Sequence, residues 1–313
     1  MAAFLRDIGR SASELAVRQI IAATGLLSPE SQRRTGRSLV SVAGAMPLLR
    51  ARALANMRLA FGEAVPSEAS QLYFRRVSWW ISNALAVFHH GVTATPVAEE
   101  VTFDDTFSAF DEAMAQGRGA VVASPHWCGH EISTALINRK YPFTLVVRQG
   151  STAEKTARKL RWYSALGVEV VVRPHGASAM KDAAAYLKVL KQNRILAITP
   201  DLLAPPDAGI EVEIFRRRAR IFPGAFAIAS AARAPLLRPF PRWQSDSSVI
   251  YSCSMSDAPL RSKDSVDAIA VAAQDWCHWF EDKLRNNPQD WLFWLDKRWS
   301  QFLRTTPRQS QIS

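Results

Sequence analysis

The stretch that decides the fold is Ala120-Val121-Val122-Ala123-Ser124-Pro125-His126-Trp127-Cys128-Gly129-His130-Glu131. Its first residues are small or β-branched and apolar, which is typical of a buried strand. Pro125 and Gly129 are turn residues, so the strand is expected to end before His126 and a helix to follow. Open α/β sheets place ligands at this end of their strands. The stretch therefore predicts a functional strand-to-helix junction.

Short apolar runs alternate with helical patterns on the carboxyl side of this junction. Strands are predicted at 143–147, 168–172 and 195–199, with extensions of the sheet at 235–240 and 249–254, and a final amphipathic helix at 264–286. Strands that alternate with helices of 10 to 15 residues favour a parallel sheet. The predicted fold class is α/β, with a mostly parallel central sheet covered by helices.

The amino-terminal part of the chain has a different pattern. Apolar residues recur at three- and four-residue spacing through 39–59 and 72–88, which predicts a helical layer. We expect an N-terminal helical, membrane-proximal region at 1–95 and an α/β catalytic region at 96–313, integrated in one domain. The most apolar early stretch, 15–27, contains Arg18 and is shorter than the roughly 20 residues of a spanning helix. It is expected to lie at an interface.

Composition indicates an anionic partner. Lys and Arg outnumber Asp and Glu by 39 to 28, which gives a net charge of +11. The chain lacks zinc-finger spacing, an RNP signature and basic-zipper heptads, so no nucleic acid is expected. Its 10 Trp residues favour an anionic membrane surface, where this side chain settles well. The odd number of scattered cysteines fits a reducing cytoplasm.

His126 and Glu131 are the candidate catalytic residues. A histidine that takes a proton from a hydroxyl benefits from a carboxylate that fixes its tautomer. His130 is a weaker candidate for the same role. The order of these residues is not His-Glu-x-x-His, which disfavours a metal site. The chain also lacks a Gly-x-Ser-x-Gly elbow and a Gly-x-Gly-x-x-Gly loop, the usual markers of hydrolases and dinucleotide-binding proteins.

Several ordered blocks, taken together, resemble the bacterial late acyltransferases of lipid A biosynthesis, within the lysophospholipid acyltransferase superfamily. The blocks are Asn56 to Gly62, His126 to Glu131 as the His-x-x-x-x-Asp/Glu motif, Val147-Arg148-Gln149, Pro200-Asp201, Pro223 to Phe226, and Pro288 to Trp299. Three positions depart from the family pattern: Leu203 replaces a second aspartate, Arg216 and its neighbours replace a Phe-Phe-Gly segment, and Asp296 replaces a histidine.

The resemblance implies a glycerolipid acyltransferase-like fold and transfer of an acyl group from an acyl carrier protein or CoA thioester, without a metal or redox cofactor. His126 would be the general base for a hydroxyl of a lipid A precursor or related glycolipid, and Glu131 its partner. A site on the cytoplasmic face of the bacterial inner membrane, peripheral or monotopic, is expected. Substrate contacts would come from Arg148, Asp201, Arg173, Arg216, Arg217, Arg218 and Arg220.

Alternatives remain open at this point. The arginines of 216–220 either cradle an anionic group or form a solvated hairpin face, and the tryptophans of 291–299 either form a membrane belt or a core cluster. The acceptor could instead be a phosphatidylinositol mannoside, an aminolipid or a secondary metabolite. A catalytically silent protein that binds anionic lipid would also explain the charge and the tryptophans.

Overall fold

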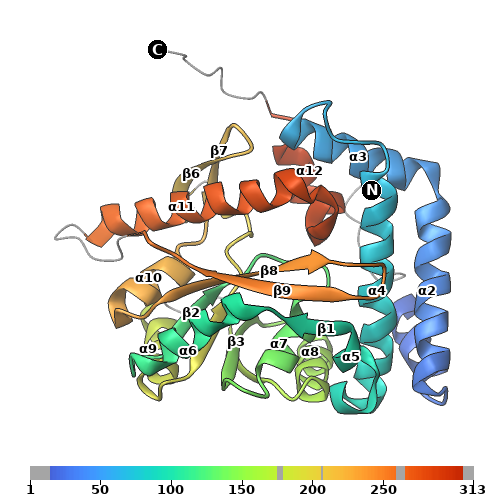
Figure 1. Cartoon of the computed structure of the whole chain (residues 1–313), viewed down its shortest axis with the longest axis horizontal. Helices are drawn as coiled ribbons and strands as arrows, with labels where there is room; N and C mark the ends of the chain where they lie inside the picture. Colours follow the sequence, from blue (N-terminus) through green and yellow to red (C-terminus); the bar gives the residue numbers. More distant parts are fainter. Residues whose placement is uncertain (1–14, 175–178, 206, 259–264, 306–313) are drawn as a thin grey trace.

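A seven-stranded sheet forms the centre of the computed structural model, which describes residues 15–174, 179–205, 207–258 and 265–305 (Figure 1). The strand order is β1-β9-β8-β2-β5-β3-β4, and only β8 and β9 pair antiparallel. The strands are β1 (Val101–Phe103), β2 (Ala120–Ala123), β3 (Phe143–Arg148), β4 (Glu169–Arg173), β5 (Ile195–Ile198), β8 (Leu236–Trp243) and β9 (Val249–Met255). The predicted α/β class with a mostly parallel sheet is confirmed.

Side chains that alternate between the two faces of the central strands create a separate hydrophobic core on each face of the sheet. Val121 and Leu196 contribute to one hydrophobic cluster, whereas Val122 and Ile195 contribute to the other. Successive side chains of a strand point to opposite faces, so both faces must be covered. One face packs against α6 (Ser108–Ala115), α7 (His130–Ile137) and α8 (Ala153–Ala165), and the other against α9 (Ala179–Lys191), α10 (Gly224–Ala232) and α11 (Ser265–Asn286).

Three longer helices form the predicted N-terminal layer: α2 (Pro29–Ala45), α3 (Pro47–Phe61) and α4 (Ala69–His90). The predicted helical run at 39–59 is divided, because Pro47 cannot continue α2 and starts α3 after a 77° bend. Ser28 caps α2 by accepting a hydrogen bond from the backbone N–H of Ser31. α2 and α4 lie side by side across one end of the sheet (Figure 1).

The length and apolar composition of the helices bear on whether the chain crosses a membrane. Residues Leu15–Thr24 form a short apolar helix, and among the described residues no single helix has both the length and the apolar composition to cross a bilayer. α2 and α3 pass that test only when taken together as a bent pair. The proposed division at residue 95 stays a prediction, although one hydrophobic cluster joins Met57 and Tyr73 of the helical layer to Val121 of the sheet.

Three strands lie outside the predicted runs, although a hairpin around 216–220 was one of the open alternatives. β1 is only three residues long, too short to show a periodicity. The hairpin β6 (Ile210–Ile214) and β7 (Arg217–Ile221) turns through Phe215 and Arg216, whose φ angles are 51° and 58°. Both signs match the two-residue type I′ turn, in which Asn-Gly is preferred. Phe215 is fully buried among aromatic rings, whereas Arg216 is exposed.

Arg216→Gly should stabilise the fold, because glycine adopts a left-handed conformation without a Cβ clash. The steric gain of about 1 kcal/mol is partly offset by the greater freedom of glycine in the unfolded chain, which leaves a net gain of roughly 0.5 kcal/mol. A urea unfolding curve with an unchanged slope measures it. Arg218→Gly is the control, since glycine within β7 should destabilise the strand. A lower midpoint for Arg216→Gly would contradict the turn analysis.

Candidate active site

His126 and Asp201 meet above the carboxyl ends of two neighbouring strands. β2 and β5 pair in parallel with Ala123 opposite Ile198, so His126 and Asp201 each lie three residues beyond one paired position. The Nδ1 atom of His126 lies 2.7 Å from Oδ1 of Asp201, and its backbone N–H donates to Oδ2 at 2.8 Å. The parallel register thus brings together two residues that are 75 positions apart in the sequence.

Two C-terminal tryptophans hold Asp201 in place. The indole Nε1–H of Trp291 donates to Oδ2 of Asp201 at 2.8 Å, and that of Trp299 donates to its backbone carbonyl at 3.0 Å. Burial raises the pKa of this fully buried carboxyl, but the charge and hydrogen bonds of His126, with the Trp291 bond, outweigh it and lower the pKa overall. Asp201 is therefore an ionised carboxylate at neutral pH.

The imidazole of His126 is fixed by its partners yet still reachable. Its side chain is 20% exposed, and the ring of Phe293 lies 4.3 Å from it, centroid to centroid. Burial lowers the pKa of His126, but the charge and hydrogen bond of Asp201, aided by Glu131 and Asp296, raise it above its ordinary value. With Nδ1–H donating to Asp201, Nε2 carries the lone pair that can accept a proton.

Glu131 does not have the position that the sequence suggested. It lies half-buried in the first turn of α7 and accepts a hydrogen bond from the hydroxyl of Tyr163 at 2.9 Å. Asp201, which was predicted among the substrate contacts, is the carboxylate bonded to His126. Glu131 is close enough to contribute a favourable charge to the imidazolium.

His130 is tied to the backbone beside this pair. Its Nδ1 lies 3.0 Å from the carbonyl oxygen of Trp127, and its ring centroid is 5.0 Å from that of His126. Burial and the neighbouring His126 lower the pKa of His130, which favours a neutral ring. Within the described ranges, no group of three His, Cys, Asp or Glu side chains is placed to hold a metal ion.

Arg148 and Arg173 lie on the same edge of the sheet as His126. They end β3 and β4 and are paired across those strands, and both are exposed. Strands are about 5 Å apart, so these arginines stand roughly 10 and 15 Å from the end of β2 along the edge. Arg173 bonds to Asp182 at 2.9 Å. The two cations thus extend the functional edge without contacting the His126 ring.

The arginines of the β6–β7 hairpin have separate roles because side chains alternate along a strand. Arg217 is buried and donates to the carbonyl oxygens of Leu59, Phe215 and Thr305. Its predicted place among the substrate-binding residues is therefore wrong, since its guanidinium holds the fold together. Arg216 and Arg218 are exposed, and Arg220 is half-buried and donates to Ala208 at 3.2 Å.

The C-terminal tryptophans form a core cluster and not a membrane belt. Trp291, Trp294 and Trp299 are 0%, 0% and 2% exposed. The segment between them also reaches the loop that follows β2, where the N–H of Leu292 donates to the carbonyl of His126 at 2.9 Å. No spacing pattern predicts these contacts, because they join segments some 90 or more residues apart.

Comparison with known proteins gives a result that agrees with this geometry. The family model for bacterial lipid A biosynthesis acyltransferases matches residues 10–301. No individual curated protein matches the chain. The matched range includes the helical layer, the sheet with His126 and Asp201, and the tryptophans that hold Asp201. The chain therefore belongs to the bacterial lipid A biosynthesis acyltransferase family, whose members the match implies to be acyltransferases.

Proposed function

We propose that this protein transfers a fatty acyl group from an acyl carrier protein or CoA thioester to a hydroxyl of a lipid A precursor or a related glycolipid, with His126 as the general base. The observation that carries the proposal is the bond between Nδ1 of His126 and the buried Asp201, which leaves Nε2 available to the acceptor. The family match supports acyl transfer in general.

The proposed reaction uses that geometry. Nε2 of His126 takes the proton of the acceptor hydroxyl while the hydroxyl oxygen attacks the thioester carbonyl carbon. The tetrahedral intermediate then collapses, its C–S bond breaks, and the leaving thiolate takes the proton back from the imidazolium. Asp201 stabilises the imidazolium in both steps without itself being protonated. The proposed cycle uses no cofactor beyond the acyl thioester.

The neighbouring charged residues support binding in this scheme. Glu131 adds a second negative charge near the imidazolium. Arg148 and Arg173, exposed at the ends of β3 and β4, are placed to bind the phosphate or acidic groups of a donor. Arg216, Arg218 and Arg220 of the hairpin would bind an anionic part of the acceptor or carrier.

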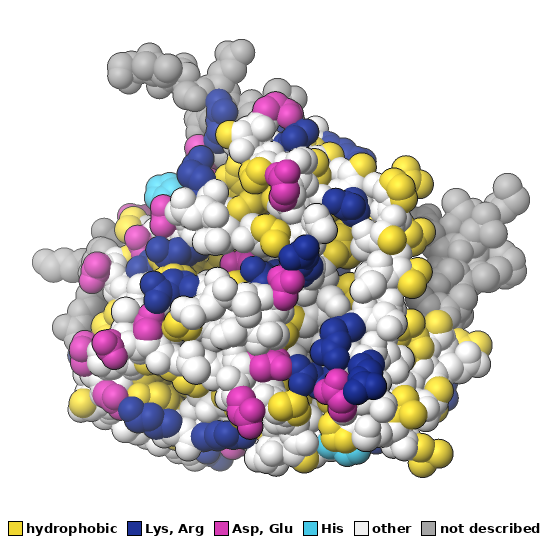
Figure 2. Space-filling model, turned by 45° about the vertical axis from the view of Figure 1, so that its right-hand side comes forward, with side chains coloured by type: hydrophobic (Ala, Val, Ile, Leu, Met, Phe, Trp, Pro, Cys, Tyr) yellow, Lys and Arg dark blue, Asp and Glu magenta, His cyan; other side chains and the backbone are white. Residues whose placement is uncertain are grey.

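Exposed apolar side chains on the N-terminal helices and the turn before α2 favour a peripheral position on an anionic membrane, as expected on the cytoplasmic face of the inner membrane. Leu26, Val42 and Leu48 are 99%, 69% and 82% exposed. Figure 2 brings this side of the molecule forward and shows hydrophobic side chains along its edge, with Lys and Arg side chains nearby. Apolar residues with basic neighbours suit the surface of an anionic bilayer.

Acyl transfer from radiolabelled acyl carrier protein and CoA thioesters to membrane glycolipid tests the reaction. His126→Ala should lower turnover about 100- to 10,000-fold, because the general base is lost. His278→Ala, a change at an exposed histidine of α11, is the control and should leave turnover unchanged. Equal turnover in the two variants would remove His126 from the chemistry. Lipid binding without any turnover in the wild type would favour a silent lipid-binding protein.

The pH dependence of kcat/KM tests the role of Asp201. Because the pKa of His126 is raised, the rate should rise with pH through a limb above the ordinary histidine range. Asp201→Asn removes the stabilising charge, so the limb should move to lower pH while the maximum rate falls. Glu131→Gln should shift the limb less than Asp201→Asn does. If Glu131→Gln gives the larger displacement, Glu131 is the partner of His126 after all.

A further inference from the structure

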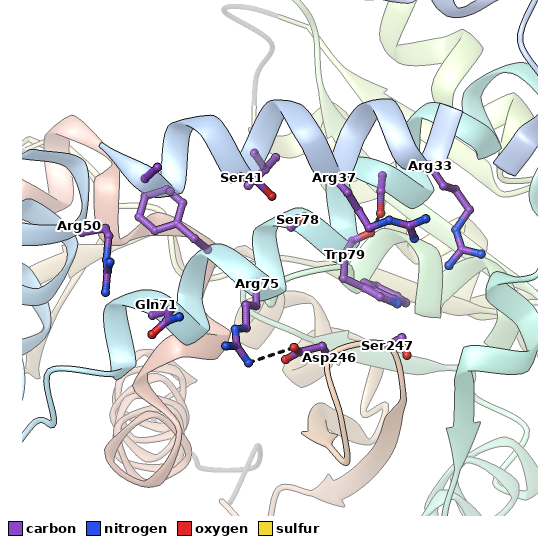
Figure 3. A pocket seen from close by; sticks show the side chains of 15 residues that line it. Arg33, Arg37, Ser41, Arg50, Gln71, Arg75, Ser78, Trp79, Asp246 and Ser247 are labelled. Carbon is purple, nitrogen blue, oxygen red and sulfur yellow. Dashed lines mark hydrogen bonds and ion pairs between the residues drawn. The ribbon is translucent and has the colours of Figure 1, made fainter. Parts of the chain in front are cut away.

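A cavity of about 470 Å³ lies between α2 and α4, apart from the His126 pair (Figure 3). Arg33, Arg37 and Ser41 line it from one face of α2, at intervals of four residues that place them one above the other. Gln71, Arg75 and Ser78 face them from α4, and Arg50 closes the α3 end. The volume is in the range of sites that hold a small ligand or headgroup.

The lining of the cavity is rich in hydrogen-bond donors. It contains four guanidinium groups, while Asp246 is the single carboxylate among its lining residues. Asp246 is paired with Arg75 at 3.0 Å. Arg50 makes no ion pair with any residue that the structure describes. Arg33 and Arg37 are paired with Glu100 and Glu30, which lie outside the lining, so Arg50 is the lining guanidinium whose positive charge a bound anion can neutralise.

Arg33 adds a buried donor to this lining. Its side chain is 8% exposed and is paired with Glu100 through one terminal nitrogen, whereas its Nε is buried and has no hydrogen-bond partner. A buried donor without a partner costs about 1 to 3 kcal/mol, so such a group calls for a ligand or ordered water. Guanidinium groups bind phosphate oxygens with two parallel hydrogen bonds.

The walls of the cavity are fixed, and one wall reaches the loop that follows β2. A Cβ added to Gly36 would lie 2.5 Å from Cα of Ser82, so α2 and α4 touch closely there. Trp79, which lines the cavity, donates from Nε1 to Glu100 at 2.7 Å, and its ring fills the space where Gly129 would carry a Cβ. Arg33, Glu100 and Trp79 thus connect the cavity to the turn that precedes α7.

We propose that this cavity binds a phosphate-bearing headgroup, at a site separate from the His126 centre. Guanidinium groups of the lining would hold the phosphate oxygens, and Ser41, Ser78 and Gln71 would hydrogen-bond the polar part of the headgroup. The phosphate is that of a membrane lipid, because α2 and α3, which line the cavity, also carry exposed apolar side chains. The inference goes beyond the proposed reaction and does not depend on it.

Binding by the full chain, measured without turnover, tests the site. The probes are inorganic phosphate, soluble dihexanoyl phosphatidic acid, and vesicles of phosphatidylcholine with or without phosphatidic acid. The test variant is Arg37→Gln with Arg50→Gln, and the control is Arg34→Gln with Arg52→Gln. The pairs are matched: Arg34 and Arg37 both bond to Glu30 from α2, but only Arg37 lines the cavity. Arg50 and Arg52 both lie on α3.

We expect the test variant to weaken dihexanoyl phosphatidic acid binding at least about tenfold, and the control by less than about twofold, because only the former removes guanidinium groups from the site. Weak inorganic phosphate binding with strong binding of the soluble lipid identifies a lipid headgroup. Equal affinity for both identifies the phosphate group alone as the ligand. The proposal is overturned if the two variants lose binding equally, which indicates general surface charge, or if the wild type binds none of the probes.

Discussion

The buried carboxylate of Asp201 is the constraint on which the rest of the site depends. A fully buried charge is costly unless it is paired and hydrogen-bonded. Here His126 supplies two donors and Trp291 a third, so the charge is retained at the end of β5. The C-terminal segment must fold over the sheet to deliver Trp291 and Trp299. The same contacts that stabilise Asp201 therefore also set the tautomer of His126 and complete the core.

The general fold was predictable from the sequence, and the pairing within the site was not. Local apolar runs predicted β2, β3, β4 and β5; β2, β3 and β5 are largely buried, whereas β4 is a half-exposed edge strand. The bond between His126 and Asp201 depends on Ala123 lying opposite Ile198, a register that no local pattern encodes. Sequence proximity favoured Glu131 instead, and α7 carries that side chain towards Tyr163. Asp201 and Glu131 were both candidate site residues, but only the strand register shows which of them bonds to His126.

The arginines show the same limit in another form. A run of cations in the sequence gives no information on which members face solvent until strand pairing is known. In β7 the alternation buries Arg217 among carbonyl oxygens and exposes Arg218. On α2 the four-residue helical interval selects Arg33 and Arg37 for the cavity and leaves Arg34 outside it. Net charge alone therefore predicts an anionic partner but cannot locate a site for it.

Two buried aspartates, Asp201 and Asp290, lie near His126, and their surroundings shift their carboxyl pKa values in opposite directions. Asp290 precedes Trp291, and burial raises the pKa of its carboxyl to about 8, with only Arg76 at 3.7 Å as a charged partner. Asp201 has three N–H donors, and its pKa is lowered. The charge of His126 and the N–H donors outweigh burial at Asp201, whereas the charge of Arg76 does not outweigh burial at Asp290. Asp201 acts on His126 more strongly than Glu131 and Asp296 do, so the N–H donors that keep Asp201 charged also sustain the raised pKa of His126.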